Sequence, residues 1–392
     1  MKSDTLVLIP GPTPVVDEVL EGLARPVLAH TDPRFVEVFR CVISRVRQIM
    51  GAREAYVVAG TGTLSMEMAL VNTLAPGERV LVVSHGYFGD RFVPLARAFG
   101  IEVDVLRAGW GKRVPVEEIG AQLGQQSYRA VTITHVDTST GVVADIAAVG
   151  PVIREAGALF ILDGVCATGG IDEDMEKYGI DVVLTGSQKA LGVPPGLALV
   201  GFGPRALEAR ARMSRVPAYY SDIANWRPVM EEPSRYFATP AVNMVFAMDV
   251  ALDIIFREGL TRRYGRHLAY GRGMRAALRA LGLTPLPVEE AAASTTTTVV
   301  YPEGLDDATF RRLMAARGIT VAGALGPLAG KAFRVGHMGN VTVAELERAV
   351  QAMAECLAEM DRPADGKGAL RALGEAAAAY AGFRPSTEFR GG

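Results

Sequence analysis

Short apolar runs alternate with amphipathic stretches over residues 55–205, and this alternation predicts repeated strand and helix units. Several runs are apolar at every position, which is typical of strands that are covered on both faces. The pattern therefore predicts an α/β protein built on a mostly parallel sheet. The predicted strands lie at residues 56–59, 80–83, 101–105, 130–133, 159–162, 180–184 and 197–200.

Beyond residue 204 the pattern changes to longer helical stretches and then to a second set of strands. We expect helices at residues 242–257, 261–281, 308–317 and 343–360, and strands at residues 295–301, 319–322 and 332–335. The last segment is rich in Ala and Gly and has few large apolar residues, which favours a loosely attached tail. The expected division is an N-terminal arm (1–20), a large domain (21–260), a small α+β domain (261–362) and the tail (363–392).

Composition and charge narrow the class of partner. The 41 Lys and Arg residues nearly balance 43 Asp and Glu residues, so the chain offers no field to gather nucleic acid or an anionic membrane. No apolar run reaches the roughly 18 residues that a membrane span needs. The three cysteines are far apart and form no CxxC pair, which argues against a disulfide framework or a cysteine zinc site. We therefore expect a cytoplasmic enzyme that acts on small molecules and has no metal.

Ligands of open parallel sheets bind beyond the carboxyl ends of the strands, so the residues that follow each run are candidates for binding. The first run leads through Thr61, Gly62 and Thr63 into a helix, where backbone N–H groups can bind a phosphate. The second run is followed by Phe88, which is placed to stack on a flat ring. Each feature has a plain alternative, because such a turn often only connects strand to helix and such an aromatic residue often only covers the core.

Two charged residues follow neighbouring buried strands. Asp163 ends the fifth run, where a carboxylate needs a charged or hydrogen-bonding partner. Lys189 is the only one of six lysines that directly follows a buried strand, and burial lowers the pKa of an amine and makes it a competent nucleophile. The two residues could simply form a structural ion pair. Together with the phosphate loop and the aromatic ring, however, they are the four parts that pyridoxal phosphate requires.

Several motifs resemble those of the class V aminotransferases, specifically the alanine/serine-glyoxylate (serine-pyruvate) branch. The likeness extends over about residues 8–360, and its motifs lie at residues 10–14, 138–142, 186–196, 235–240 and 333–339, with Asp163 upstream of the third motif. The resemblance implies the pyridoxal-phosphate-dependent transferase fold of type I, which is like that of aspartate aminotransferase. It also implies a seven-stranded sheet in the large domain and a homodimer with active sites at the subunit interface.

The resemblance further implies a role for each matching residue. Lys189 holds the cofactor as an imine and Asp163 pairs with its ring nitrogen, so that an amino group moves from alanine or serine to glyoxylate or pyruvate by a ping-pong reaction. Arg334 and Gly11 contact the substrate, the arginine by a two-pronged bond to its carboxylate. The other implied cofactor contacts are Thr61, Gly62, Thr63 and Gln188 on the phosphate, Tyr236 and Thr239 on the partner subunit's phosphate, and Phe88, Val165 and Thr138 on the ring.

Other activities stay open on the same fold. Residues 294–298 and 333–339 also resemble branches that use pyridoxamine or 2-aminoethylphosphonate as amino donor with pyruvate as acceptor. A cysteine desulfurase-like lyase needs a reactive cysteine near the substrate, and Cys41, Cys166 and Cys356 lie in patterns that favour packing. A non-catalytic scaffold is the remaining alternative, against which the intact Lys189, Asp163 and Arg334 argue.

Overall fold

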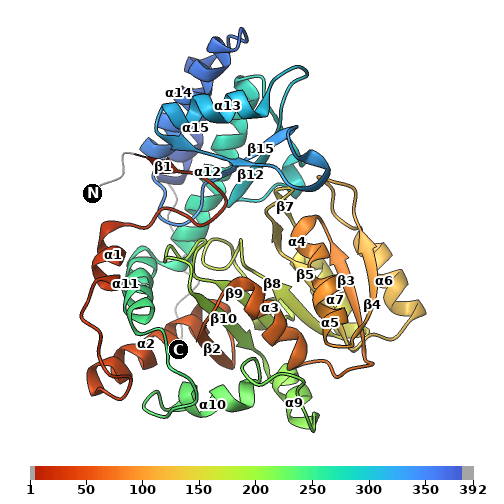
Figure 1. The fold of residues 1–392 in the computed structure, drawn as a ribbon. Helices are drawn as coiled ribbons and strands as arrows, with labels where there is room; N and C mark the ends of the chain where they lie inside the picture. Colours follow the sequence, from red (N-terminus) through yellow and green to blue (C-terminus); the bar gives the residue numbers. More distant parts are fainter. Residues whose placement is uncertain (1–4, 382–392) are drawn as a thin grey trace.

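A seven-stranded sheet forms the centre of the molecule in the computed structural model, which describes residues 5–381 (Figure 1). Its strand order is β2-β10-β9-β8-β5-β3-β4, and only β10 runs antiparallel to its neighbours. The predicted mostly parallel seven-stranded sheet is therefore confirmed. The strands are β2 (Glu54–Ala59), β3 (Arg79–Ser84), β4 (Glu102–Arg107), β5 (Ala130–Thr134), β8 (Leu159–Asp163), β9 (Val182–Gly186) and β10 (Leu197–Phe202).

Helices pack on this sheet and bury its middle strands. Every residue of β5, β8, β9 and β10 is buried, which explains why these runs are apolar without alternation. Contacts join α3 to β9 and β10, α5 to β3 and β4, α2 to β2 and β10, and α7 to β8. The helices of this part are α1 (Asp17–Leu23), α2 (Pro33–Met50), α3 (Gly62–Val71), α4 (Tyr87–Asp90), α5 (Phe92–Ala98), α6 (Val116–Gln125), α7 (Ile146–Glu155), α8 (Met175–Tyr178), α9 (Pro204–Arg212), α10 (Ile223–Glu231) and α11 (Val242–Glu258).

A four-stranded sheet in the order β11-β12-β15-β14 lies above the central sheet in Figure 1. It has a hydrophobic cluster of its own, separate from the cluster around the central sheet. Its strands are β11 (Thr284–Pro285), β12 (Thr296–Val300), β14 (Ala322–Gly323) and β15 (Ala332–Gly336). The strands β6 (Val136–Asp137) and β7 (Val142–Val143) form a separate two-stranded sheet. The remaining helical elements are α12 (Leu260–Ala280), α13 (Asp307–Ala316), α14 (Val343–Glu359), α15 (Gly366–Ala381) and the 3₁₀ turns η1 (Glu289–Ala291) and η2 (Gly326–Leu328).

The N-terminal arm joins the two sheets. Its strand β1 (Leu6–Val7) pairs in parallel with β13 (Ile319–Thr320), and the Leu8 carbonyl accepts a hydrogen bond from Gly336 N at the end of β15. Five residues later, Thr13 N donates to the Gln188 carbonyl and Thr13 Oγ1 donates to the Lys189 carbonyl at 2.8 Å. The arm therefore connects the strand of Arg334 with the turn of Lys189.

The C-terminal segment differs from the expected loosely attached tail. Residues Gly366–Ala381 form α15, which packs against α12 and α14. Ala369 and Leu373 are fully buried in the hydrophobic cluster of the four-stranded sheet. A few small apolar residues on one helical face are enough to hold the helix, and mean composition conceals that spacing. The rest of the expected tail, residues 382–392, lies outside the described residues.

Candidate active site

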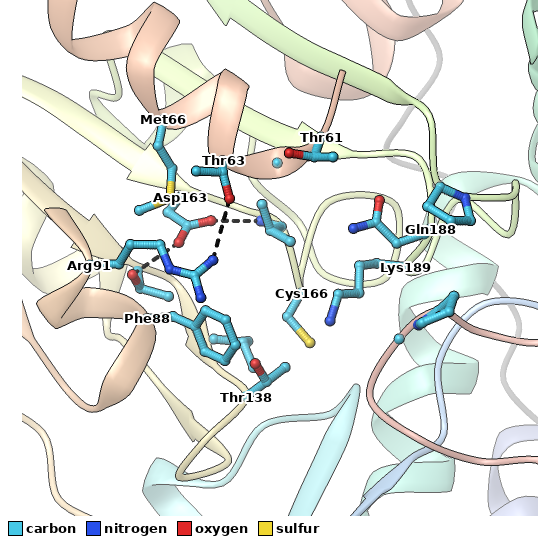
Figure 2. A pocket seen from close by; sticks show the side chains of 17 residues that line it. Thr61, Thr63, Met66, Phe88, Arg91, Thr138, Asp163, Cys166, Gln188 and Lys189 are labelled. Carbon is cyan, nitrogen blue, oxygen red and sulfur yellow. Dashed lines mark hydrogen bonds between the residues drawn. The ribbon is translucent and has the colours of Figure 1, made fainter. Parts of the chain in front are cut away.

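The carboxyl ends of β2, β3, β5, β8 and β9 meet at one edge of the central sheet and open on a cavity of about 300 Å³. Ten of the thirteen residues proposed from the sequence line it: Gly11, Thr61, Gly62, Thr63, Phe88, Thr138, Asp163, Val165, Gln188 and Lys189. Figure 2 shows Lys189 and Gln188 on one side of the cavity and Phe88 and Arg91 on the other. Loops far apart in the sequence are thus brought together.

Asp163 ends β8 and lies at the buried base of the cavity. Its carboxylate accepts hydrogen bonds from Val165 N at 3.0 Å and from Thr134 Oγ1 at 3.1 Å (Figure 2). Burial raises the pKa of Asp163 to about 6, because the low-dielectric surroundings disfavour its charge more than these hydrogen bonds favour it. A cationic group bound next to Asp163 would favour the charged carboxylate and lower its pKa again.

Lys189 lies in the turn between β9 and β10, and its Nζ donates a hydrogen bond to the Pro10 carbonyl of the arm. Burial lowers the pKa of Lys189, and the nearby charges of Arg334 and Arg91 lower it further. Gly11 leaves room for this side chain, since a Cβ atom at Gly11 would lie 2.6 Å from Lys189 Nζ. The amine is thus both desolvated and held at a defined place in the cavity.

Thr61, Gly62 and Thr63 form the start of α3. Thr61 is the N-cap residue, but its side chain makes no capping hydrogen bond, so its hydroxyl is free to bind a ligand. Gln188 Oε1 is buried without a hydrogen-bond partner among the described residues, so the amide of Gln188 is not fully satisfied within the chain. A helix N-terminus of this kind favours an anion.

Phe88 lies in α4 and is held there by a residue that the sequence analysis did not single out. Asp137 is fully buried, and its Oδ2 accepts hydrogen bonds from Phe88 N and Gly89 N, each at 3.0 Å. Its Oδ1 accepts from Ser139 N at 3.0 Å. The only signal in the sequence was a carboxylate within a loop of hydroxyl residues, which is common in ordinary turns.

Arg334 lies on β15 of the four-stranded sheet, near the cavity but not among the residues that line it. Its Nε donates to the Gly323 carbonyl at 2.9 Å, and its Nη1 lies 3.4 Å from the carbonyl oxygen of Thr138, which lines the cavity. Burial lowers the pKa of Arg334. The guanidinium therefore lies next to the cavity with N–H donors left for an anionic group.

Like Arg334, Tyr236 and Thr239 are not among the residues that line this chain's own cavity. They lie between α10 and α11, where the Tyr236 hydroxyl is 3.4 Å from Thr239 Oγ1. The Tyr236 side chain is 63% exposed. Both residues are available to another molecule.

Cys166 lines the cavity beside Val165, closer to the reactive groups than the sequence indicated. Its thiol is buried 3.9 Å from Met338 Sδ, and burial raises its pKa to about 11. A thiol with such a pKa stays protonated near neutral pH and is a poor nucleophile. Cys356 is also buried, within α14, and Cys41 lies in α2. The arrangement disfavours a cysteine desulfurase-like reaction.

Within residues 5–381, no helix is both long and apolar enough to cross a membrane. The same residues contain no cluster of three His, Cys, Asp or Glu side chains that could hold a metal ion.

Comparison with known proteins places these features in a family. Residues 22–343 match the family model described as aminotransferase class-V. The chain is 36% identical to alanine--glyoxylate aminotransferase 1 of Saccharomyces cerevisiae, with 86% of this chain and 93% of the yeast protein covered. It is 31% identical to serine--glyoxylate aminotransferase of Arabidopsis thaliana, with 87% of each covered. The structure of pyridoxamine-pyruvate aminotransferase from Mesorhizobium loti superposes with a TM-score of 0.91 at 27% identity, over 95% of this chain and 97% of that one.

Proposed function

The chain belongs to the class V aminotransferases, and from that premise we propose that it moves the amino group of alanine or serine to glyoxylate or pyruvate with pyridoxal 5'-phosphate as cofactor. The donor amino acid becomes a 2-oxo acid and the acceptor becomes an amino acid. The observation that supports this proposal most strongly is the placement of buried Asp163 and Lys189 around one cavity at the N-terminus of α3.

The residues present fit the cofactor. Asp163, whose charge is disfavoured by burial, suits a protonated ring nitrogen, and the uncapped start of α3 with Thr61 and Thr63 suits a phosphate. Gly62 leaves space next to the ring position, because a Cβ atom there would lie 2.9 Å from Val165 Cγ2. When bound, pyridoxal phosphate supplies an electron-withdrawing ring that stabilises negative charge on the substrate α-carbon.

Residues of this chain would hold the cofactor and move the proton of the substrate. Lys189 Nζ would hold the cofactor's carbonyl carbon and, once displaced by the substrate amine, take the proton from the substrate α-carbon. Asp163 would keep the ring nitrogen protonated. The other cofactor contacts would come from Thr61, Gly62, Thr63 and Gln188 at the phosphate, from Phe88, Val165 and Thr138 at the ring, and from Tyr236 and Thr239 of a second copy of the chain at that phosphate.

The preference for a short amino acid rests on charge and space. Arg334 would bind the substrate carboxylate with two parallel hydrogen bonds, the geometry that a guanidinium favours. Gly11 in the wall of the cavity presents backbone rather than a side chain, and a cavity of about 300 Å³ that would also hold the cofactor leaves little room for a long donor. Both features favour alanine or serine over a longer donor.

The likeness to a pyridoxamine-pyruvate aminotransferase supports a second candidate donor. A half-reaction screen distinguishes the candidates: alanine, serine, aspartate, 2-aminoethylphosphonate and pyridoxamine are each added to the cofactor-loaded protein, and loss of the cofactor's absorbance is followed. We expect alanine or serine to react. Reaction with pyridoxamine or the phosphonate alone would refute the donor assignment.

We further propose a homodimer, because Tyr236 and Thr239 are exposed in the single chain and away from its cavity. The nearly balanced charge favours a location in the cytoplasm. The two hydrophobic clusters support a division into an arm (1–20), a large domain (21–260) and a small domain (261–362).

A further inference from the structure

Arg91 lines the cavity and was not among the residues proposed from the sequence. It lies between α4 and α5, and its guanidinium lies 4.8 Å from the centre of the Phe88 ring and 5.7 Å from that of Tyr87. Its Nη1 is 3.4 Å from Thr63 Oγ1 on the first turn of α3 (Figure 2). The side chain is therefore held over the aromatic ring and directed at the start of that helix.

The guanidinium has no carboxylate partner in the described part of the chain. Its neighbour Asp90 pairs instead with Arg107 at 2.8 Å. One long hydrogen bond to a hydroxyl and two ring contacts leave most of the five N–H donors of Arg91 without an acceptor. A half-buried guanidinium facing a cavity in this state is suited to bind an anion.

The charge of a phosphate group, compared with the positive charge that the cavity supplies, favours phosphate as the anion. Among residues 5–381, Arg91 and Lys189 are the only cationic side chains that line the cavity. Lys189 Nζ already donates a hydrogen bond to the Pro10 carbonyl. A phosphate monoester carries about −1.5 to −2 charges at neutral pH, whereas a helix N-terminus offers only about half a positive charge. The hydroxyls of Thr61 and Thr63 add donors but no charge.

From these observations we infer that Arg91 binds the phosphate group of the cofactor, together with Thr63 and the N-terminus of α3. The inference rests on the proposed function, because it assumes that pyridoxal phosphate occupies the cavity. The guanidinium supplies the positive charge at the phosphate end, and its contact with Phe88 fixes its position.

The test compares pyridoxal phosphate with pyridoxal, which lacks the phosphate. Dissociation constants of both are measured by absorbance titration of the cofactor-free protein and of the variants R91Q, R91K and R97Q. R91Q should weaken binding of pyridoxal phosphate about 10- to 100-fold and leave binding of pyridoxal nearly unchanged, because one charged hydrogen-bonding partner of the phosphate is lost. R91K, which keeps the charge but not the planar set of N–H donors, should lie in between. Arg97 is an exposed residue of α5, so R97Q should behave as the unaltered protein.

The other outcomes separate this inference from the proposed function. An unaltered protein that binds neither ligand contradicts the proposed function itself. An R91Q protein that binds both ligands less tightly by the same factor shows that Arg91 only supports the ring of Phe88, and the inference fails. It also fails if the preference for the phosphorylated ligand is unchanged while the KM for aspartate rises, since Arg91 then serves a second substrate carboxylate. If R91Q does not fold, R91K takes its place in the comparison, and an R91K protein with an unchanged preference for the phosphorylated ligand overturns the inference.

Discussion

At the scale of single residues, the burial of Asp163 predicts that the affinity for the proposed cofactor depends on pH. Burial raises its pKa from the usual 3.8 to about 6. Proton uptake by Asp163 therefore stabilises the cofactor-free fold as pH falls from about 6 to about 4, and this stabilisation is lost as pH rises through 6. The charged form, which a protonated ring nitrogen needs as its partner, is present above pH 6.

We therefore predict that the cofactor-free protein binds pyridoxal phosphate about tenfold less tightly at pH 5 than at pH 7, because each pH unit below the pKa removes about nine-tenths of the carboxylate. The D163N variant is the control. It has no carboxyl group to titrate at this position, so any pH dependence of its affinity comes from the phosphate of the ligand. Equal pH dependence in both proteins, measured by absorbance titration, would show that Asp163 does not pair with the ring.

Lys189 is predicted to be needed for turnover but not for cofactor binding. K189A removes the desolvated amine and should lower kcat by about 10³-fold, while the phosphate and ring contacts remain. Binding is checked by equilibrium dialysis and turnover by a coupled assay of the 2-oxo acid product. The matched control is K112A, because Lys112 is exposed and is not among the residues that line the cavity. Near-normal turnover of K189A would remove Lys189 from the mechanism.

At the scale of elements, the sequence predicted strand positions well because buried strands are continuous apolar runs, such as residues 159–162 within β8. It did not predict that β10 is inserted between β2 and β9 in the antiparallel direction, since strand order depends on contacts between distant segments. The strand expected at residues 319–322 divides into β13, which pairs with the arm, and β14, which pairs with β15. A strand of two residues is too short to show the alternation of apolar and polar positions that predicts a strand, so the sequence does not indicate these pairings.

The same limit applies to the candidate site. Gly11, Asp163 and Lys189 were predicted because a motif or a strand end marks each position. Arg91 was missed because its proposed role depends on a ring contact with Phe88 and on the approach of α3, which are visible only in three dimensions. Arg residues are also common in this chain, so a single arginine in the sequence does not indicate a binding site.

The arm is predicted to tolerate no side chain at Gly11. A Cβ atom there would displace the Lys189 side chain, and the residue also has a φ of +118°. G11A should lose most of its activity and should shift the absorbance of the bound cofactor. Gly77 has a φ of +86°, and a Cβ atom there would meet no other atom within 4 Å, so G77A is the matched control for backbone strain. Both variants should lose about 1–3 kcal/mol of stability in urea unfolding, and only G11A should lose activity.

At the scale of the whole molecule, we predict a homodimer whose sites depend on both copies. Sedimentation should give twice the mass of the chain, because symmetric pairs are the commonest assembly and the Tyr236 side chain is largely exposed in the single chain. The double variant Y236A/T239A should bind pyridoxal phosphate less tightly and pyridoxal equally well. A fully active monomer would contradict the shared site.

The N-terminal arm also acts as a strap of fixed length between the two sheets. Leu8 is bonded to the end of β15 and Thr13 to the turn of Lys189, and five residue steps span at most about 18 Å. On the side of the arm, the end of β15 and the turn of Lys189 can therefore separate by no more than this strap allows. A wider opening between the two sheets would have to form on the side away from the arm.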